Sequence, residues 1–120
     1  MINIAEIEKA IGAHGLWKGR LRAAIDSGSS EFKVEKVQLD NQCDFGKWLY
    51  SLPASEQQSE FGKKVMALHK EFHVQAAQLL SLAVTGKKKE AEAAISLGSN
   101  FSRISSELTR TLSEWKKVAK

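Results

Sequence analysis

The chain has 120 residues, of which 42% are hydrophobic, and it carries a formal net charge of +4 and a single cysteine. This length predicts one domain over residues 1–120 with one core, and a single cysteine excludes a disulfide-stapled secreted scaffold. No stretch reaches the roughly 18 consecutive apolar residues of a membrane span, and residues 1–12 lack the pattern of a signal peptide. We therefore expect a soluble, cytoplasmic protein that has no membrane partner.

The positive charge is spread over small groups of lysines with glutamates nearby in the chain, as at residues 63–64, 87–89 and 116–117. This pattern is typical of solvated helix surfaces. No aromatic or glycine-rich recognition motif accompanies the lysines, so we expect no nucleic-acid partner.

The first predicted helix begins after Asn3, a possible cap, and ends in the turn cluster "DSGSS" from Asp26. Its apolar positions are separated by sums of three and four residues, and His14 and Trp17 fall on the same stripe. The apolar positions are Ile4, Ile7, Ile11, Leu21 and Ile25. This stripe predicts a helix that faces the core.

A polar stretch follows, and then "QCDFGKWLYSL" at residues 42–52 contains the only cysteine. Phe45, Trp48, Leu49 and Leu52 have the spacing of one face of a short helix. With Asp40 as a plausible N-cap, Cys43 would lie in the first turn, where the helix dipole favours a thiolate. Gly46, one turn further on, would leave space beside the sulfur for an ion or for a neighbouring helix.

Two further long helical patterns complete the chain. One runs from near Ser55, after the break at Pro53, to Gly86. The other runs over residues 87–118, and we expect Gly98 to weaken this helix without ending it. Together the patterns predict an all-α four-helix bundle, with three long helices and one short helix that bears the cysteine.

The three histidines all lie on or beside apolar stripes. His69 and His73 are four residues apart, so they lie on one face of a helix, one turn above the other. Each histidine alone is most simply a hydrogen-bonded core residue. Together with Cys43, however, His14, His69 and His73 form a set of imidazoles and a thiolate typical of tetrahedral zinc sites, and facing helices of a bundle bring such ligands together.

The same set argues against a catalytic zinc site, because four protein ligands leave no open position for water. In "HKEFH", Glu71 also lies at the wrong offset for a zinc hydrolase. We therefore expect a protein that is not an enzyme. Asp40, Asp44 and Glu71 are candidates for orienting an imidazole N–H, and the sequence does not choose among them.

Three motifs resemble the chemoreceptor zinc-binding (CZB) domain family: "HGLW" at residues 14–17, "CDFGKWLY" at 43–50 and "HKEFH" at 69–73. His-x-x-x-His alone is common, but the three blocks in this order and spacing are specific. The resemblance assigns zinc to His14, Cys43, His69 and His73, and it implies a four-helix bundle that tends to form homodimers.

Members of this family are attached to bacterial chemoreceptors and diguanylate cyclases, which implies a sensory role in chemotaxis or cyclic-di-GMP signalling. The implied signal is zinc availability, or an oxidant such as hypochlorous acid acting on the zinc-bound cysteine. The chain has neither a chemoreceptor signalling hairpin nor a cyclase motif, so we expect a standalone form or a piece of a larger protein, with its signalling partner in cis or in trans. The alternative is a structural or adaptor bundle in which zinc is only a stabilising staple.

Overall fold

The computed structural model describes residues 3–119, and over this range the chain contains helices and no strand. The prediction of an all-α fold is therefore confirmed. In chain order the helices are α1 (Ile4–Ser27), α2 (Val34–Val37), α3 (Asp44–Ser51), α4 (Ala54–Gln57), α5 (Glu60–Val84), α6 (Lys88–Ile95) and α7 (Asn100–Ala119).

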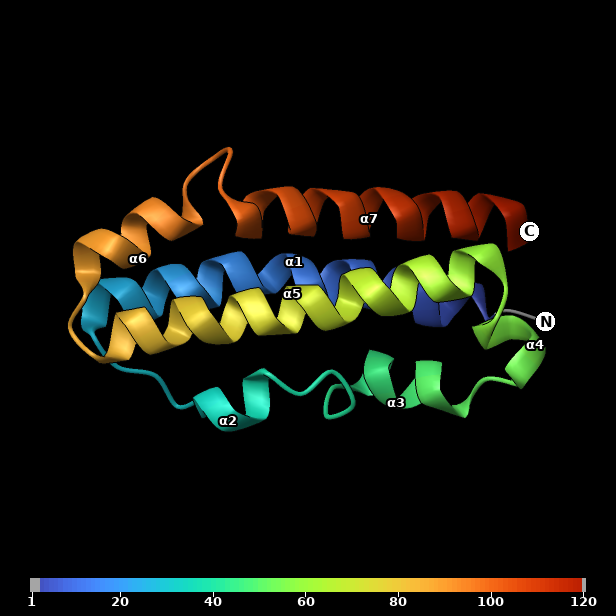
Figure 1. The fold of residues 1–120 in the computed structure, drawn as a ribbon, viewed down its shortest axis with the longest axis horizontal. Helices are drawn as coiled ribbons and strands as arrows, with labels where there is room; N and C mark the ends of the chain where they lie inside the picture. The colour runs from blue at the N-terminus through green and yellow to red at the C-terminus, as the bar shows by residue number, and fades with distance from the viewer. Residues whose placement is uncertain (1–2, 120) are drawn as a thin grey trace.

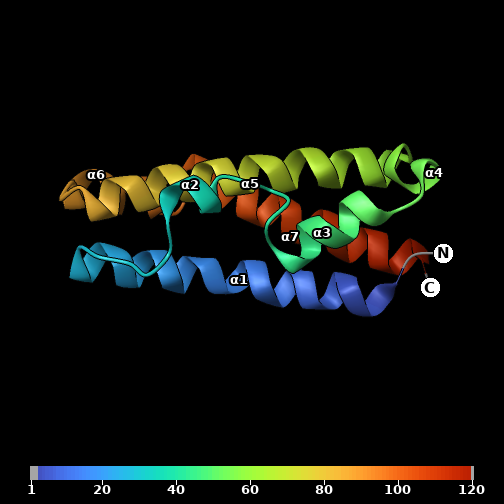
Figure 2. The same cartoon turned by 90° about the horizontal axis from the view of Figure 1, so that it is seen from below.

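The helices form an elongated bundle with principal extents of 45 × 25 × 20 Å. Helices α1 and α5 run along its middle, α6 and α7 follow each other along one side, and α2 and α3 lie on the opposite side (Figure 1). Figure 2, seen from below, shows α2 lying over α5, and α3 lying between α5 and α1. The fourth position of the bundle is thus filled by two short helices and the loop between them, where the sequence predicts one short helix.

Helix α1 begins and ends as its sequence predicts. The Asn3 side chain accepts a hydrogen bond from the Ala5 backbone N–H at 3.0 Å, which satisfies one of the free N–H groups of the first turn. At the other end, Gly28 adopts a left-handed conformation with φ of 75°, and its N–H bonds back to the Ala24 carbonyl. A glycine in this conformation is a common way to end a helix.

The third long helix is interrupted, so the prediction of one continuous helix over residues 87–118 is wrong. Ser96 is extended after α6, and Gly98 has φ of 85°, which takes the chain out of the helical conformation before α7 begins. A side chain rarely adopts this backbone conformation, but glycine does so at little cost. Helices α6 and α7 still run one after the other along α5 (Figure 1).

The second long helix also begins later than predicted. Residues near Ser55 form only the single turn α4, and the chain restarts at Ser59, whose hydroxyl accepts a hydrogen bond from the Gly62 N–H at 3.0 Å. Ser59 is therefore the N-cap of α5. Because α4 folds back closely, a methyl group on Gly62 would lie within 2.1 Å of the Glu56 carbonyl oxygen.

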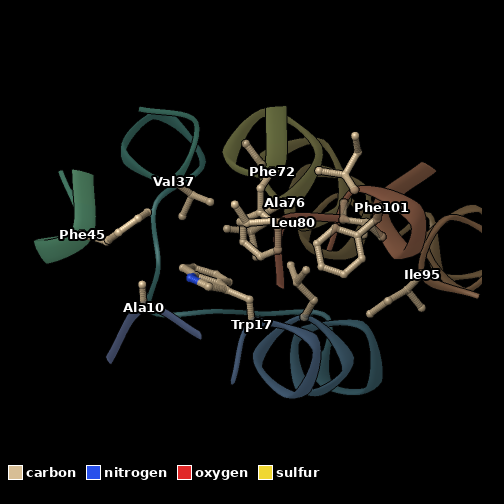
Figure 3. Packing of buried hydrophobic residues seen from close by; sticks show 14 of the residues in the cluster. Ala10, Trp17, Val37, Phe45, Phe72, Ala76, Leu80, Ile95 and Phe101 are labelled. Carbon is tan, nitrogen blue, oxygen red and sulfur yellow. The ribbon is translucent and has the colours of Figure 1, made fainter. Parts of the chain in front are cut away.

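The core is built from the apolar stripes of α1, α5 and α7, to which the short helices add a few side chains. Figure 3 shows Trp17 of α1, Val37 of α2 and Phe72 of α5 directed toward one another. The largest side chains that are almost fully buried are Ile7, Leu21, Leu49, Val65, His69, Phe72, Leu80, Ile95, Leu108, Thr111 and Leu112. Within residues 3–119, no helix combines the length and apolar character needed to cross a bilayer.

Candidate metal centre

Four side chains that the sequence predicts as metal ligands meet in the middle of the bundle. His14 comes from the middle of α1, His69 and His73 come from successive turns of α5, and Cys43 immediately precedes α3. One nitrogen or sulfur atom from each residue lies within 4.8 Å of the corresponding atoms of the others. His14, His69 and His73 are only 5%, 0% and 3% exposed, so the three imidazoles are shielded from water, whereas Cys43 is only partly buried.

Hydrogen bonds to backbone carbonyls fix the tautomers of two of the imidazoles. His14 Nδ1 lies 2.8 Å from the Ala10 carbonyl oxygen, and His73 Nδ1 lies 2.9 Å from the Val37 carbonyl oxygen. A carbonyl oxygen can only accept, so Nδ1 carries the proton in both rings. In the neutral rings, Nε2 therefore keeps a free lone pair, which is what a metal ion requires.

The distances within the cluster fit an ion with tetrahedral coordination. His69 Nε2 lies 3.0 Å from His73 Nε2, and the Cys43 Sγ lies 3.3 Å and 3.6 Å from these two nitrogens. Zinc bonds of 2.0–2.3 Å in tetrahedral geometry place the ligand atoms about 3.3 to 3.6 Å apart. The separations among Cys43, His69 and His73 are thus close to the edge lengths of such a tetrahedron, His14 offers a nitrogen within 4.8 Å of the other three atoms, and the residues present fit a zinc ion.

Cys43 has a second role that corrects a prediction. Cys43, and not Asp40, is the N-cap of α3, because its Sγ accepts a hydrogen bond from the Gly46 N–H at 3.3 Å. Asp40 accepts a hydrogen bond from the Tyr50 hydroxyl at 2.7 Å instead. The sulfur therefore contacts the first turn of its own helix and two histidines of α5.

Gly46 serves the site through the preceding loop. A methyl group at this position would lie 1.8 Å from the Asp40 carbonyl oxygen and 3.1 Å from the Asn41 Cα. The space beside Gly46 is thus filled by the backbone of residues 40–41, and not by an ion or a neighbouring helix. Only glycine lets this loop approach α3 closely enough to leave Cys43 at its present position.

Aromatic rings enclose the imidazoles. Phe45 meets the edges of His14 and His69 at ring-centroid distances of 5.7 and 5.1 Å. Phe72 packs in the same way against His14 at 5.1 Å and His73 at 5.8 Å. These rings exclude water from the histidines and restrict their rotation.

Burial keeps all four side chains uncharged when no cation is among them. Burial lowers the pKa of His14 to about 4 and that of His69 to about 2, and it also lowers the pKa of His73. Burial raises the pKa of the Cys43 thiol. The imidazoles are thus already in the neutral form that binds metals, while a bound cation would reverse the effect on Cys43 by stabilising the thiolate.

Backbone carbonyls, and not carboxylates, orient two of the histidines. Glu71 accepts a hydrogen bond from Gln75, and Asp40 acts on His73 only through its charge, as one of the groups that raise its pKa. The carbonyl of Ala10 lies four residues before His14 in the same helix, a spacing that could have suggested this contact. No pattern in the sequence points to Val37. His69 Nδ1 is buried without a hydrogen-bond partner in the described chain.

Comparison with known families gives one match. The family described as the chemoreceptor zinc-binding domain matches residues 14–80, which is more than half of the chain and contains all four clustered residues. Comparison with curated proteins gives no match, and neither does comparison with solved structures.

Proposed function

This chain belongs to the chemoreceptor zinc-binding domain family, and on that premise we propose that residues 1–120 form one sensory domain that responds to zinc or to oxidants. Family membership and the cluster of three histidines and one cysteine support a zinc-binding signalling domain. The proposal adds the identity of the ligands, the nature of the signal and the part of the chain that responds.

We assign zinc to His14, Cys43, His69 and His73. The observation that carries this assignment is the convergence of one nitrogen or sulfur atom from each residue within 4.8 Å, with two imidazoles held in the required tautomer. Among these atoms, those of Cys43, His69 and His73 lie 3.0–3.6 Å apart. When bound, zinc would supply a positive charge that holds the four side chains together and keeps Cys43 as a thiolate. With all four positions filled by protein, the site serves regulation and not catalysis.

Cys43 is the ligand best placed to report a change. The three histidines belong to long helices that are packed along their length, whereas Cys43 begins an eight-residue helix between two loops. If the sulfur is released, α3 loses its attachment to α5 at that point. The expected response is a local shift of α3 against α1 and α5, a two-state change that a dimer partner or a fused output domain could read.

Oxidation would release the sulfur in the same way. Attack of the Cys43 thiolate on hypochlorous acid gives a sulfenic acid and chloride, so the sulfur loses two electrons, the chlorine gains two, and the proton remains on the new S–OH group. The neutral sulfenic acid is a weaker ligand than the thiolate. Because Cys43 is only partly buried and lines an open cleft, an oxidant can reach it.

The ligand assignment is tested by metal analysis of protein purified without added zinc. We expect about one equivalent of tightly held zinc, and a large loss of affinity in Cys43→Ala and His69→Ala. Ser51→Ala, at the other end of α3, is the matched control and should bind zinc as the wild type does. A wild-type chain with less than about a tenth of an equivalent and no tight site on titration would refute the assignment.

The sensory role is tested through two tryptophans. Trp48 of α3 packs against Trp115 of α7 with ring centroids 6.0 Å apart, so their fluorescence should change when α3 moves. We expect the same change on stepwise chelation and on addition of one equivalent of hypochlorite. The oxidant response should vanish in Cys43→Ser and persist in Met66→Leu, which removes the other oxidisable sulfur within residues 3–119. If neither treatment moves α3, zinc is only a structural staple.

We further propose that the domain is cytoplasmic, forms a homodimer and acts on a chemoreceptor or a diguanylate cyclase, in cis or in trans. Family membership supports a signalling partner of this kind. Sedimentation of the zinc-loaded chain tests the dimer, because a monomer at micromolar concentrations would refute it. The partner is tested by measuring the output of each candidate receptor or cyclase with wild-type chain and with Cys43→Ala.

A further inference from the structure

A cleft opens beside the metal centre, between α1 and the segment over residues 31–48. Its volume is about 790 Å³, within the range of pockets that bind small molecules. Its inner wall includes His14, Cys43 and His73. Figure 3 shows the Trp17 indole directed from α1 toward Val37, with Phe45 and Ala10 nearby, and all four residues line the cleft.

The two ends of the cleft differ in charge. Arg20, Lys33 and Lys36 line one end together with a single carboxylate, Glu31. None of these three cations forms an ion pair within residues 3–119. The first end therefore carries unpaired positive charge.

The opposite end is negative. It is lined by Glu6, Lys9 and Asp44, and Lys9 is already paired with Glu6 at 3.3 Å. The charges of Glu6 and Lys9 cancel, so Asp44 gives this end a net negative charge. A dianion that reached both ends would be repelled here, so the cleft suits a ligand with one anionic group.

Arg20 is held in place by aromatic rings. Its guanidinium lies 5.1 Å from the ring centroid of Trp17 and 5.1 Å from that of Phe32. Cation–π contacts of this kind fix the direction of an exposed arginine without neutralising its charge. The anion-attracting group is thus preorganised at the mouth of an aromatic-walled cleft.

The dimensions of the cleft set the size of the ligand. Arg20 and His14 are six residues apart on α1, which at the helical rise corresponds to about 9 Å. An anionic group near Arg20 therefore leaves length for a planar body about as long as a bicyclic ring, along the lining to which Trp17 and Val37 contribute. A flat apolar body also matches the aromatic lining better than a sugar or a nucleotide.

We propose that this cleft is a second binding site, which takes a small planar organic monoanion with its carboxylate or sulfonate at Arg20, Lys33 and Lys36. The apolar body of the ligand lies along Trp17 and extends toward the metal centre. The anionic group is recognised by Arg20, Lys33 and Lys36, which are outside the proposed ligand set, so this proposal does not depend on zinc sensing.

The test uses the zinc-loaded chain and two probes that differ only in charge, indole-3-acetate and its neutral amide. Amide and indole N–H signals are followed by NMR during titration. A probe of this size should bind with a dissociation constant of about 1 mM. We expect indole-3-acetate to shift the signals of Trp17 and of residues 31–37, with α6 unchanged, and the neutral amide to bind at least about fivefold more weakly.

Two matched variants isolate the charges. Lys33→Gln combined with Lys36→Gln removes two cations from the cleft and should weaken indole-3-acetate about five- to tenfold, the effect expected of two exposed ion pairs. Lys63→Gln combined with Lys64→Gln removes the same charge from exposed positions on α5 and should leave binding unchanged. Both variants should keep one equivalent of zinc.

Three results of the titrations would each overturn the proposal: no shift up to about 10 mM probe, equal binding of the acid and the amide, or equal effects of the two double variants. Signals of residues 31–37 that move with protein concentration alone would also overturn it, because a second copy of the chain would then cover the cleft. Zinc content is measured separately, so failure of this site and failure of the metal assignment give different results.

Discussion

Two sides of the bundle are attached to α1 and α5 by different means. On one side, α7 presents six buried residues along its whole length, Phe101, Ile104, Leu108, Thr111, Leu112 and Trp115. On the other side, α2, α3 and α4 together bury only Val37, Phe45, Gly46 and Leu49. The second side adds buried or partly buried polar attachments, namely the Cys43 contacts with His69 and His73 and the bond from His73 to the Val37 carbonyl. The ion pair from α7 to α1, Lys116 with Glu8 at 3.9 Å, lies at the surface.

This difference separates stability from response. Burial of apolar side chains stabilises α7 without regard to any ligand, since that contribution depends on area removed from water. The attachment of α3 depends much more on a few polar atoms whose interactions change with metal, protons and oxidants. The side formed by α2, α3 and α4, which buries less apolar surface than α7, is thus also the side whose structure can change with a chemical signal.

Removal of zinc should have the largest effect, and it should separate the two sides. Zinc at a thousand times its dissociation constant stabilises the folded chain by about 4 kcal/mol. After chelation, we expect the amides of α3 to lose at least about a hundredfold of their protection from hydrogen exchange, while α7 stays protected. A loss that is uniform over α3 and α7 would show that the two sides respond as one unit.

Leu112→Ala should destabilise the bundle on the α7 side. Leu112 is fully buried on α7, so its truncation should cost about 3 kcal/mol in urea unfolding, by the same amount with and without zinc. The variant should still bind one equivalent of zinc. Leu49→Ala, the same change on α3, is the matched control and should lower zinc affinity; an equal effect of both variants on zinc would contradict the distinction.

Acidification of the zinc-free chain should lower its stability through the buried histidines. The pKa of His14 is lowered from 6.5 to about 4 by burial, so between these values the unfolded chain binds more protons than the folded one. Stability therefore falls as the pH drops from 6.5 toward 4, by about 2 to 3 kcal/mol for His14 alone. Chemical denaturation across this range measures the slope, which should be shallower in His14→Phe; equal slopes would exclude His14 as the cause.

Gly46→Ala should have the smallest of these effects and should act only at α3. Its methyl group meets the backbone of Asp40, and moving that loop should cost about 2 kcal/mol, seen as a weakening of zinc binding of about thirtyfold. Gly12→Ala on α1 is the control, because its methyl group meets nothing within 4 Å and should stabilise the helix by about 0.5–1 kcal/mol. Unchanged zinc affinity in Gly46→Ala would mean that the loop yields freely.

Sequence periodicity was sufficient to predict α1, the helical class and the shared face of His69 and His73, whereas the meeting of all four clustered residues was predicted from their residue types and from the family resemblance. The first three follow from local rules: Asn3 can cap, Gly28 can end a helix, and His69 and His73 share a face because of their spacing. Periodicity was not sufficient at Gly98. A glycine within a helical pattern carries only a weak penalty, and whether the chain leaves the helix there is decided by how α6 and α7 each pack on α5.

The contacts that prepare the site were beyond prediction for a different reason. The bond between His73 and the Val37 carbonyl joins residues 36 apart, and it depends on the path of a loop that has no periodic pattern. The same loop forms one wall of the cleft beside the metal centre. Cys43 was predicted inside the first turn of the helix because Asp is a preferred N-cap residue and Asp40 was available. The path of the loop instead places the Cys43 sulfur at the N-cap.

The position of Cys43 at the start of α3 also bears on the order of folding. An eight-residue helix is too short to form by itself, since its first turn must be nucleated at a cost that isolated short helices do not recover. Here the sulfur that caps this turn is the atom that contacts α5, so the nucleus of α3 depends on a surface that exists only after α5 has formed. We therefore expect α3 to be the last helix to form during folding and the first to be lost during unfolding.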